Sequence, residues 1–142
     1  MKKIISTIGL IGLIVLMTGL LTAAAPLPVT TFELVNGLTP PTFTMNVGET
    51  VTVVVQVKSN VPFLFAQALP TAQFPGRGVV GAVGDHVGAG TTATLEVTFT
   101  AKNPTDLYAN TPGFSPVSVI VGVRYKGGYV ATQRYDFIVK VP

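Results

Sequence analysis

The sequence has 142 residues, with no Cys, no Trp and one His, and its nine Lys and Arg face six Asp and Glu. This length favours a single domain. Without Lys2 and Lys3, which belong to the leader described next, seven basic residues oppose six acidic ones, a net charge of +1. No dense stripe of Lys and Arg is present for neutralising phosphates, so we expect no nucleic-acid partner.

The first 24 residues have the layout of an export signal. Lys2 and Lys3 precede the apolar run Ile4 to Leu21, and small residues follow it in "TAAAP". We place the cleavage after Ala24, because a cut one residue later would put Pro26 beside the broken bond. The run is also close to the length that spans a bilayer, so an uncleaved membrane anchor stays open as the alternative.

Either interpretation exports residues 25–142, which we expect to form one domain at the cell surface or outside the cell. Membrane contact is expected only through the leader, if it is uncleaved. The absence of Cys means that no disulfide crosslinks this exported domain, so its stability must come from core packing.

The segment "APLPVTTFELVNG" follows the leader and predicts a first strand at Thr30 to Val35. This N-terminal arm could pair with its own sheet, or it could insert into the open edge of a neighbouring molecule. Its composition favours the first arrangement. Like this first strand, those predicted at Thr42 to Val47 and at Phe63 to Ala68 are weaker, and "NGLTPP" and "NVGE" mark turns among them.

Two segments alternate strictly between apolar and polar residues, which predicts strands with one buried face. In "ETVTVVVQVK" the buried face carries the alternate valines, and in "TTATLEVTFTAK" it carries a mixed apolar set. The inward residues are expected to be Val51, Val53, Val55 and Val57 in the first segment and Ala93, Leu95, Val97 and Phe99 in the second.

Phe63 and Phe65 allow two interpretations. Both could fill the core as alternate residues of one strand, or they could join Phe74 in an apolar patch for a ligand or partner. Core placement is favoured for at least one of the pair. Phe74 lies among Gly and Pro and is the better surface candidate.

The stretch from Pro70 to Gly90 is rich in Gly and predicts at most one short strand, near Val79 to Val83. Within it, "GRGVVG" matches the G-x-G-x-x-G pattern of dinucleotide-binding folds. Such a site needs a strand before the glycines and a helix starting within them, whereas here Pro75 precedes the match and no helical periodicity follows. We interpret the match as coincidental, expect no nucleotide or other cofactor, and assign the glycines to turns and close backbone approach.

His86 follows Asp85, and the two could form an acid–base pair or contribute to a metal site. A zinc site needs three or four ligands, but this is the one His in the sequence and Cys is absent. A Ser-His-Asp arrangement would need a convergence that the sequence does not indicate. We therefore expect an exposed Asp-His pair in a loop, no metal site and no enzymatic activity.

The segment from Lys102 to Pro116, "KNPTDLYANTPGFSP", contains three Pro and predicts a loop. Tyr108 and Phe114 in this loop could cap the end of the domain or face a partner. The complete set of candidate partner-binding residues is Phe74, Arg77, His86, Tyr108 and Phe114.

The C-terminal segment "SPVSVIVGVRYKGGYVATQRYDFIVKVP" predicts a hairpin whose register can be derived. A three-residue loop, Lys126 to Gly128, pairs Tyr125 with Tyr129 and gathers the apolar residues of both strands on one face. A two-residue loop would exchange the faces, so burial selects the first register. Gly128 would then supply the left-handed residue that closes the turn. The expected cross-strand neighbours are Ile120 with Arg134 and Ser118 with Asp136.

Together these elements predict an all-β fold, an immunoglobulin-like β-sandwich of about seven strands behind an N-terminal hydrophobic signal or anchor helix. Three segments resemble CARDB-like and archaeal surface-layer-associated Ig-like domains: "NVGETVTVVVQVKSN", "GAGTTATLEVTFTAKNP" and "PVSVIVGVRYKGGYVATQRYDFIVKV". The resemblance covers Asn46 to Val141. It implies an extracellular adhesive, spacer or assembly module without catalysis.

Domains of that family often occur as repeats in long chains, whereas this sequence carries one copy, which favours self-assembly or partner docking over a spacer role. We therefore expect a structural, assembly or adhesive module, such as a filament or surface-layer component, that uses strand pairing at its sheet edges. The alternative is a module that binds a glycan or small ligand through the loops 70–90 and 102–116.

Overall fold

The computed structural model describes residues 25–35, 42–72, 80–103 and 115–142, and all regular structure in these ranges is β-strand. The fold is therefore all-β, as predicted. The strands in chain order are β1 (Thr30–Leu34), β2 (Thr42–Thr44), β3 (Thr50–Ala72), β4 (Val80–Val83), β5 (Asp85–Val87), β6 (Gly90–Ala101), β7 (Ser115–Tyr125) and β8 (Val130–Lys140).

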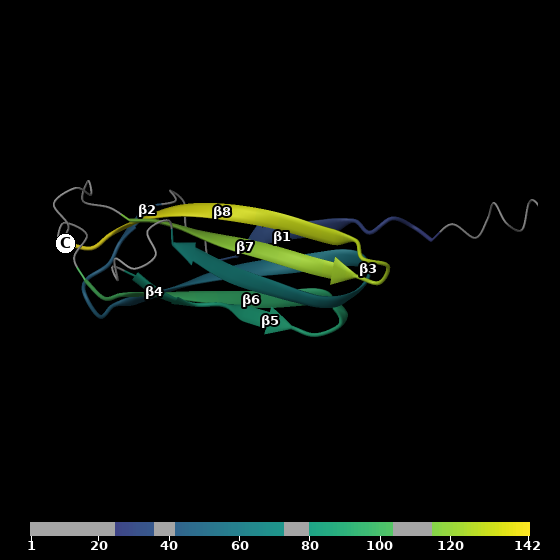
Figure 1. The fold of residues 1–142 in the computed structure, drawn as a ribbon, viewed down its shortest axis with the longest axis horizontal. Helices are drawn as coiled ribbons and strands as arrows, with labels where there is room; N and C mark the ends of the chain where they lie inside the picture. The colour runs from purple at the N-terminus through teal and green to yellow at the C-terminus, as the bar shows by residue number, and fades with distance from the viewer. Residues whose placement is uncertain (1–24, 36–41, 73–79, 104–114) are drawn as a thin grey trace, which may run out of the picture.

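The strands form one sheet in the order β2-β8-β7-β3-β6-β4, with β1 and β5 also paired to β3. Every pairing is antiparallel except that of β2 with β8. The first half of β3 pairs with β6 and β1, and its second half pairs with β7 and β5. The sheet therefore folds on itself along β3 into two layers, and Figure 1 shows β3 running from the β6 side to the β7 and β8 side.

One hydrophobic core fills the space between the layers. Apart from Met45 and Val141, its residues come from the alternating inward positions of β3, β6, β7 and β8, which is the pattern that strands with one buried face produce. Val53, Val55, Leu95 and Val97 are fully buried and Val57, Ala93 and Phe99 nearly so, as predicted, whereas Val51 is only partly buried. The β7 and β8 contribution is Val117, Val119, Val121, Val123, Tyr125, Phe137 and Val139.

The predicted hairpin register is confirmed. The Tyr125 backbone N–H donates to the Tyr129 carbonyl oxygen at 2.9 Å, and β7 pairs with β8 in the expected alignment, Ile120 opposite Arg134 and Ser118 opposite Asp136. Gly127 and Gly128 both have φ near +90° (90° and 89°), so the turn uses two left-handed residues where the sequence predicted one.

The predicted strand at Phe63 to Ala68 is confirmed, but it is not a separate one, because β3 is continuous from Thr50 to Ala72. The pairing partners of β3 change at two register shifts, between Lys58 and Phe63 and between Phe63 and Phe65. These irregularities exchange the faces of the strand, as bulges do. Phe63 is buried, whereas Phe65 is only partly buried and Ala66 and Ala68 take the inward positions.

The described part of the Gly-rich stretch, residues 80–90, contains two short strands, β4 and β5, where at most one was predicted. Gly84 joins them, and a Cβ at this position would overlap the backbone carbonyl oxygen of Ala68. This close backbone approach occurs at Gly84, outside the G-x-G-x-x-G match for whose glycines it was predicted. The strand predicted to end at Val47 ends at Thr44 instead, because Asn46 to Glu49 form a turn in which Gly48 has a φ of 88°.

Residues 1–24, which carry the predicted signal or anchor helix, lie outside the described residues, as does most of the predicted loop 102–116. Within the described ranges no helix is long and apolar enough to cross a membrane.

Candidate functional site

His86, the described member of the five candidate partner-binding residues, lies on β5 opposite Gln67 and is exposed. The expected loop position is therefore wrong, although the expected exposure is confirmed. Phe74, Arg77, Tyr108 and Phe114 lie outside the described residues, as do positions 76–79 of the G-x-G-x-x-G match. The last two residues of that match, Val80 and Gly81, begin strand β4 rather than a helix.

Asp85, beside His86, uses both carboxylate oxygens to hold backbone amides. Oδ1 accepts the N–H of His86 at 2.8 Å, and Oδ2 accepts the N–H of Glu96 on β6 at 3.0 Å. Within the described ranges, no group of three His, Cys, Asp or Glu residues is placed to hold a metal ion. The Asp85 carboxylate therefore stabilises the backbone of both β5 and β6.

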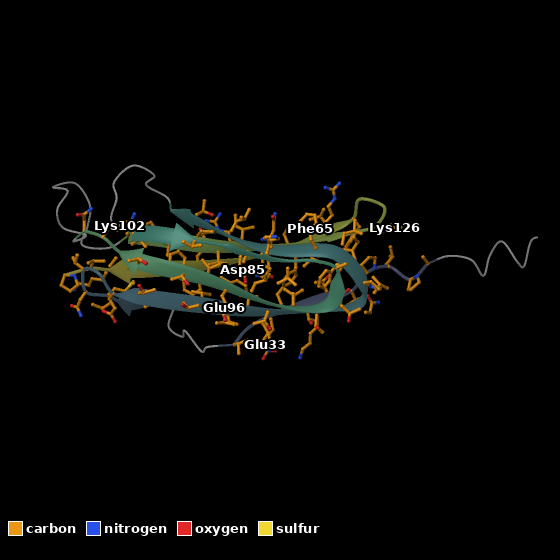
Figure 2. The ribbon with its side chains drawn as sticks, turned by 90° about the horizontal axis from the view of Figure 1, so that it is seen from below. Glu33, Phe65, Asp85, Glu96, Lys102 and Lys126 are labelled. Atoms are coloured by element: carbon orange, nitrogen blue, oxygen red, sulfur yellow. The ribbon has the colours of Figure 1, made fainter. Side chains whose placement is uncertain are left out.

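The Asp85 carboxylate caps two backbone amides on one side of the folded sheet. In an antiparallel strand, alternate residues point their backbone groups away from the partner strand, and here the N–H groups of His86 and Glu96 do so. Both are capped by the same side chain. Figure 2 shows Asp85 and Glu96 near the middle of the molecule, between the two ends marked by Lys102 and Lys126. We call this side the closed edge (β4, β5 and the adjoining part of β6).

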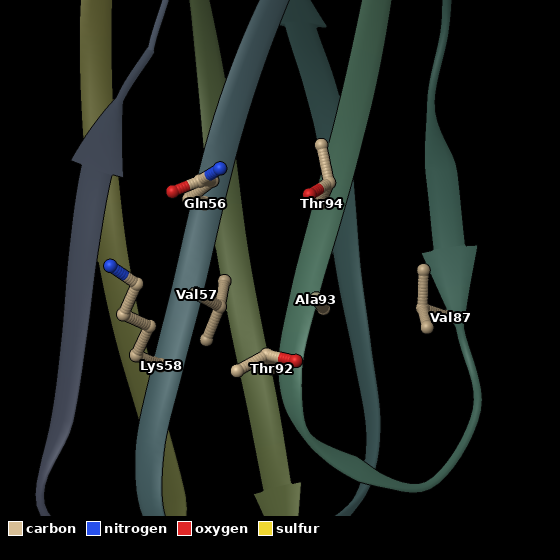
Figure 3. Close-up of a pocket in the computed structure, with 7 residues that line it drawn as sticks. All are labelled: Gln56, Val57, Lys58, Val87, Thr92, Ala93 and Thr94. Atoms are coloured by element: carbon tan, nitrogen blue, oxygen red, sulfur yellow. The ribbon is translucent and has the colours of Figure 1, made fainter.

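A hollow of about 370 Å³ lies beside the closed edge, where β5 and β6 diverge toward their turn. Figure 3 shows Val87 on β5 across from Ala93 and Thr94 on β6, with Gln56 and Lys58 on β3. The polar groups around it are hydroxyls, an amide and one ammonium group, which can donate hydrogen bonds but provide no carboxylate or imidazole for acid–base chemistry.

The opposite side of the sheet is formed by β1 and β8, and its backbone groups are largely uncapped. Since Tyr129 and Tyr125 form a hydrogen-bonded pair, the alternation points the backbone groups of Val130, Thr132, Arg134 and Asp136 away from β7. Strand β2 covers β8 only at residues 138–140, and no other described strand pairs with this side of β8. We call residues 130–136 of β8 the open edge.

The side chain of Gln133 caps part of the open edge with a hydrogen bond. Gln133 donates a hydrogen bond from Nε2 to the backbone carbonyl oxygen of Arg134 at 3.1 Å, which is one of the outward-pointing groups. The open edge has no Pro and no register shift, two of the devices that proteins use to block strand addition. Its local protection is this amide cap together with the charged side chains of Arg134 and Asp136.

The pKa of Tyr135 on β8 is raised in the folded protein, and Glu33 on β1 contributes to this shift. Burial raises the pKa of the Tyr135 phenol, and the negative charge of Glu33 raises it further. Both causes disfavour the phenolate, so Tyr135 stays a neutral hydrogen-bonding group at physiological pH.

Strand β1 is held in its own molecule. It pairs with residues 55–59 of β3, as the favoured interpretation of the N-terminal arm predicted. The Tyr125 hydroxyl lies 2.6 Å from Thr30 Oγ1 and donates to Ser59 Oγ at 2.8 Å, and this ring is only 2% exposed. These two hydrogen bonds join β1, the bend of β3 and the end of β7, and they anchor the arm in cis.

A polar cluster lies on the outer face of the β7–β8 pair. Arg134 donates from Nε to Asp136 Oδ1 at 2.7 Å and from Nη2 to Ser118 Oγ at 3.2 Å. Ser118 is only 2% exposed although it points outward. Its hydroxyl faces a guanidinium rather than a base, so the cluster does not form a nucleophile–base pair.

Periodicity could not indicate that Asp85 caps two strands, because the second amide lies eleven residues further along the chain. A local signal did exist, since Asp side chains readily accept hydrogen bonds from nearby backbone N–H groups.

We find no protein-family model that matches this chain and no curated protein with significant similarity to it.

Proposed function

We propose that residues 25–142 form an exported, non-enzymatic, immunoglobulin-like module that assembles with further copies of itself by strand pairing at the open edge. The observation that carries this proposal is the difference between the two edges of the sheet. Asp85 caps the outward amides of β5 and β6 on one side, whereas β8 leaves residues 130–136 without a neighbouring strand in the described part of the chain.

The immunoglobulin-like assignment is supported by the strand neighbours. In an immunoglobulin constant domain one layer has the order A-B-E-D and the other C-F-G. Here β1, the first half of β3, β6 and β4 follow the first order, and the second half of β3, β7 and β8 follow the second. Strands B and C of such a domain would correspond to the two halves of β3.

The geometry of the open edge defines how two copies would pair. An antiparallel partner that uses all of residues 130–136 places Gln133 opposite its own counterpart and Thr132 opposite Arg134 of the other copy. Every outward-pointing residue then meets another outward-pointing residue, which is the condition for a hydrogen-bonded ladder. Such a contact is self-complementary, as a two-fold interface requires.

Substitution of the open edge tests the proposal. Thr132→Pro removes an N–H that β7 does not use, so the hairpin is retained while strand addition is blocked. Thr132→Ala is the matched control. Size-exclusion chromatography with light scattering is expected to show concentration-dependent assembly for the parent and the control, and a monomer for Thr132→Pro.

A second variant acts in the opposite direction. Gln133→Val uncaps the Arg134 carbonyl and should strengthen assembly, and adding Thr132→Pro should reverse that gain. A parent chain that stays monomeric at all concentrations, or assembly that Thr132→Pro leaves unchanged, would refute pairing at this edge. Glycan binding by a monomeric parent would instead favour the loop-binding alternative.

A further inference from the structure

Four segments meet at one end of the described domain, which we call the hairpin tip (residues 25–30, 58–65, 88–92 and 124–130). Asn60 holds the arm there, since its Oδ1 accepts the Val29 N–H at 2.8 Å and its Nδ2 donates to the Leu27 carbonyl at 3.3 Å. Phe63 pairs with both Tyr125 and Gly90, which brings the other segments together. In Figure 1 the purple chain that begins at Ala25 lies at the same end as the β7–β8 turn.

The hairpin tip exposes a large share of the apolar surface. Eleven large apolar side chains are exposed among the described residues, and five of them lie in the tip. Exposed apolar side chains that gather in one place mark interaction sites more often than scattered ones do. The five are Leu27 (80% exposed), Val29 (61%), Val130 (52%), Leu64 (50%) and Tyr129 (49%).

The same end is positively charged. The tip segments contain Lys58, Arg124 and Lys126 and no Asp or Glu, although residues 25–142 as a whole carry a net charge of only +1. All three cations are exposed. Figure 2 shows Lys126 at this end and Lys102 at the other. Apolar side chains surrounded by cations are the composition that binds the interface of an anionic bilayer.

We propose that the hairpin tip docks on an anionic lipid surface, with Leu27, Val29, Leu64 and Tyr129 entering the interface and the three cations contacting phosphate headgroups. Tyr is a residue that membrane interfaces favour. The chain enters this tip at Ala25, directly after the apolar leader. A membrane-embedded leader would therefore leave the domain with its tip toward the lipid. The proposal does not depend on pairing at the open edge.

Vesicle co-sedimentation tests this with the chain that begins at Ala25, which contains all eight described strands; circular dichroism and a cooperative melt first establish that it folds. It should bind vesicles of equal parts phosphatidylglycerol and phosphatidylcholine and bind pure phosphatidylcholine far more weakly. Arg124→Glu/Lys126→Glu should weaken binding by about thirtyfold or more, since each surface cation contributes a factor of roughly five. The matched control, Lys102→Glu/Lys140→Glu, makes the same change in net charge at the opposite end.

A second pair of variants tests the apolar part. Leu27→Ser should weaken binding to the same vesicles several-fold, whereas Val83→Ser, an exposed position away from the tip, should not. Equal losses in the two charge-reversal variants, Arg124→Glu/Lys126→Glu and Lys102→Glu/Lys140→Glu, would reduce the effect to net charge and overturn the proposal. Failure of the parent to bind would also overturn it. A tip variant that changes the molar mass in the absence of vesicles, with no change in vesicle binding, would assign the surface to a second copy instead.

The full chain offers an independent measurement, because it contains no Cys and single labels can be placed freely. In full-length protein reconstituted into the same vesicles, a fluorophore at Tyr129→Cys should be quenched by headgroup-labelled lipid. Arg124→Glu/Lys126→Glu should reduce that quenching, and a label at Lys102→Cys should be quenched in neither background. If quenching at position 129 is the same with and without Arg124→Glu/Lys126→Glu, the leader alone holds the domain near the membrane. That result would overturn docking by the tip.

Discussion

The carboxylate of Asp85 and the backbone amide of Glu96 are joined at 3.0 Å across two strands that do not pair with each other. The second Asp85 oxygen accepts the His86 N–H at 2.8 Å, so this side chain replaces the strand that the edge lacks. A carboxylate that accepts two backbone hydrogen bonds both stabilises the edge and blocks it against other strands.

We predict that Asp85→Ala lowers the free energy of unfolding by about 1–3 kcal/mol, because two edge amides lose a charged acceptor. Urea denaturation followed by circular dichroism measures the change. Glu96→Ala is the control, since the hydrogen bond uses the backbone of Glu96 and not its side chain. Equal losses in both variants would show that the capping geometry is unimportant.

We predict that Tyr125→Phe destabilises β1 more than the rest of the fold. The variant keeps the buried ring but removes the hydroxyl that bonds to Thr30 and Ser59, at a cost of about 1–2 kcal/mol. Hydrogen exchange should accelerate first at the β1 amides of residues 31 and 33, which face β3. Tyr129→Phe, whose hydroxyl contacts no partner in the described structure, should leave these rates unchanged.

Two glycines should respond to Ala in opposite directions. At Gly84 the new methyl group would overlap the Ala68 carbonyl oxygen, so we expect Gly84→Ala to cost about 1–3 kcal/mol. At Gly122, inside β7, the methyl group meets open space, and Ala should stabilise the strand by about 0.5–1 kcal/mol. Thermal melts of the two variants check both signs, and a loss at Gly122 would contradict the described packing.

Tyr135 makes stability depend on pH at the alkaline end. Burial, and then the charge of Glu33, raise its folded-state pKa above the ordinary value of 10.0, so the unfolded chain loses this proton first. The contribution of Tyr135 to the free energy of unfolding is complete below pH 10 and falls as the pH rises toward and through the folded pKa. An absorbance titration should show one phenolate that forms at a higher pH than an ordinary tyrosine. Tyr135→Phe should remove this part of the signal. Glu33→Gln should lower the pKa only partly, because burial is the larger cause.

The hairpin could be predicted from the sequence in detail because its register depends on local facts, the Gly-Gly turn and the alternation around it. The continuity of β3 could not. Pro62 and the changed alternation after Lys58 have the appearance of a strand end, whereas the chain absorbs both in register shifts and continues into the second layer. The partly exposed position of Phe65 is the direct result of those shifts.

Which strand edges are covered was harder to predict from the sequence than which residues form the core. Inward valines can be recognised by period alone, but whether a strand edge is covered depends on contacts between residues far apart in the chain. Asp85 illustrates this, since its expected position was an exposed loop and its observed role is to cap two strands. The hairpin tip likewise gathers four segments, none of which is unusual by itself.

The long strand β3 belongs to both layers, and this has a mechanical consequence. A domain built from two separate sheets can lose one sheet while the other survives, but here the same ribbon supplies the central ladder of each. Tearing residues 50–58 from β6 also removes the support of residues 63–72 against β7. The protein should therefore resist load until it yields in a single event, with no half-intact form in between.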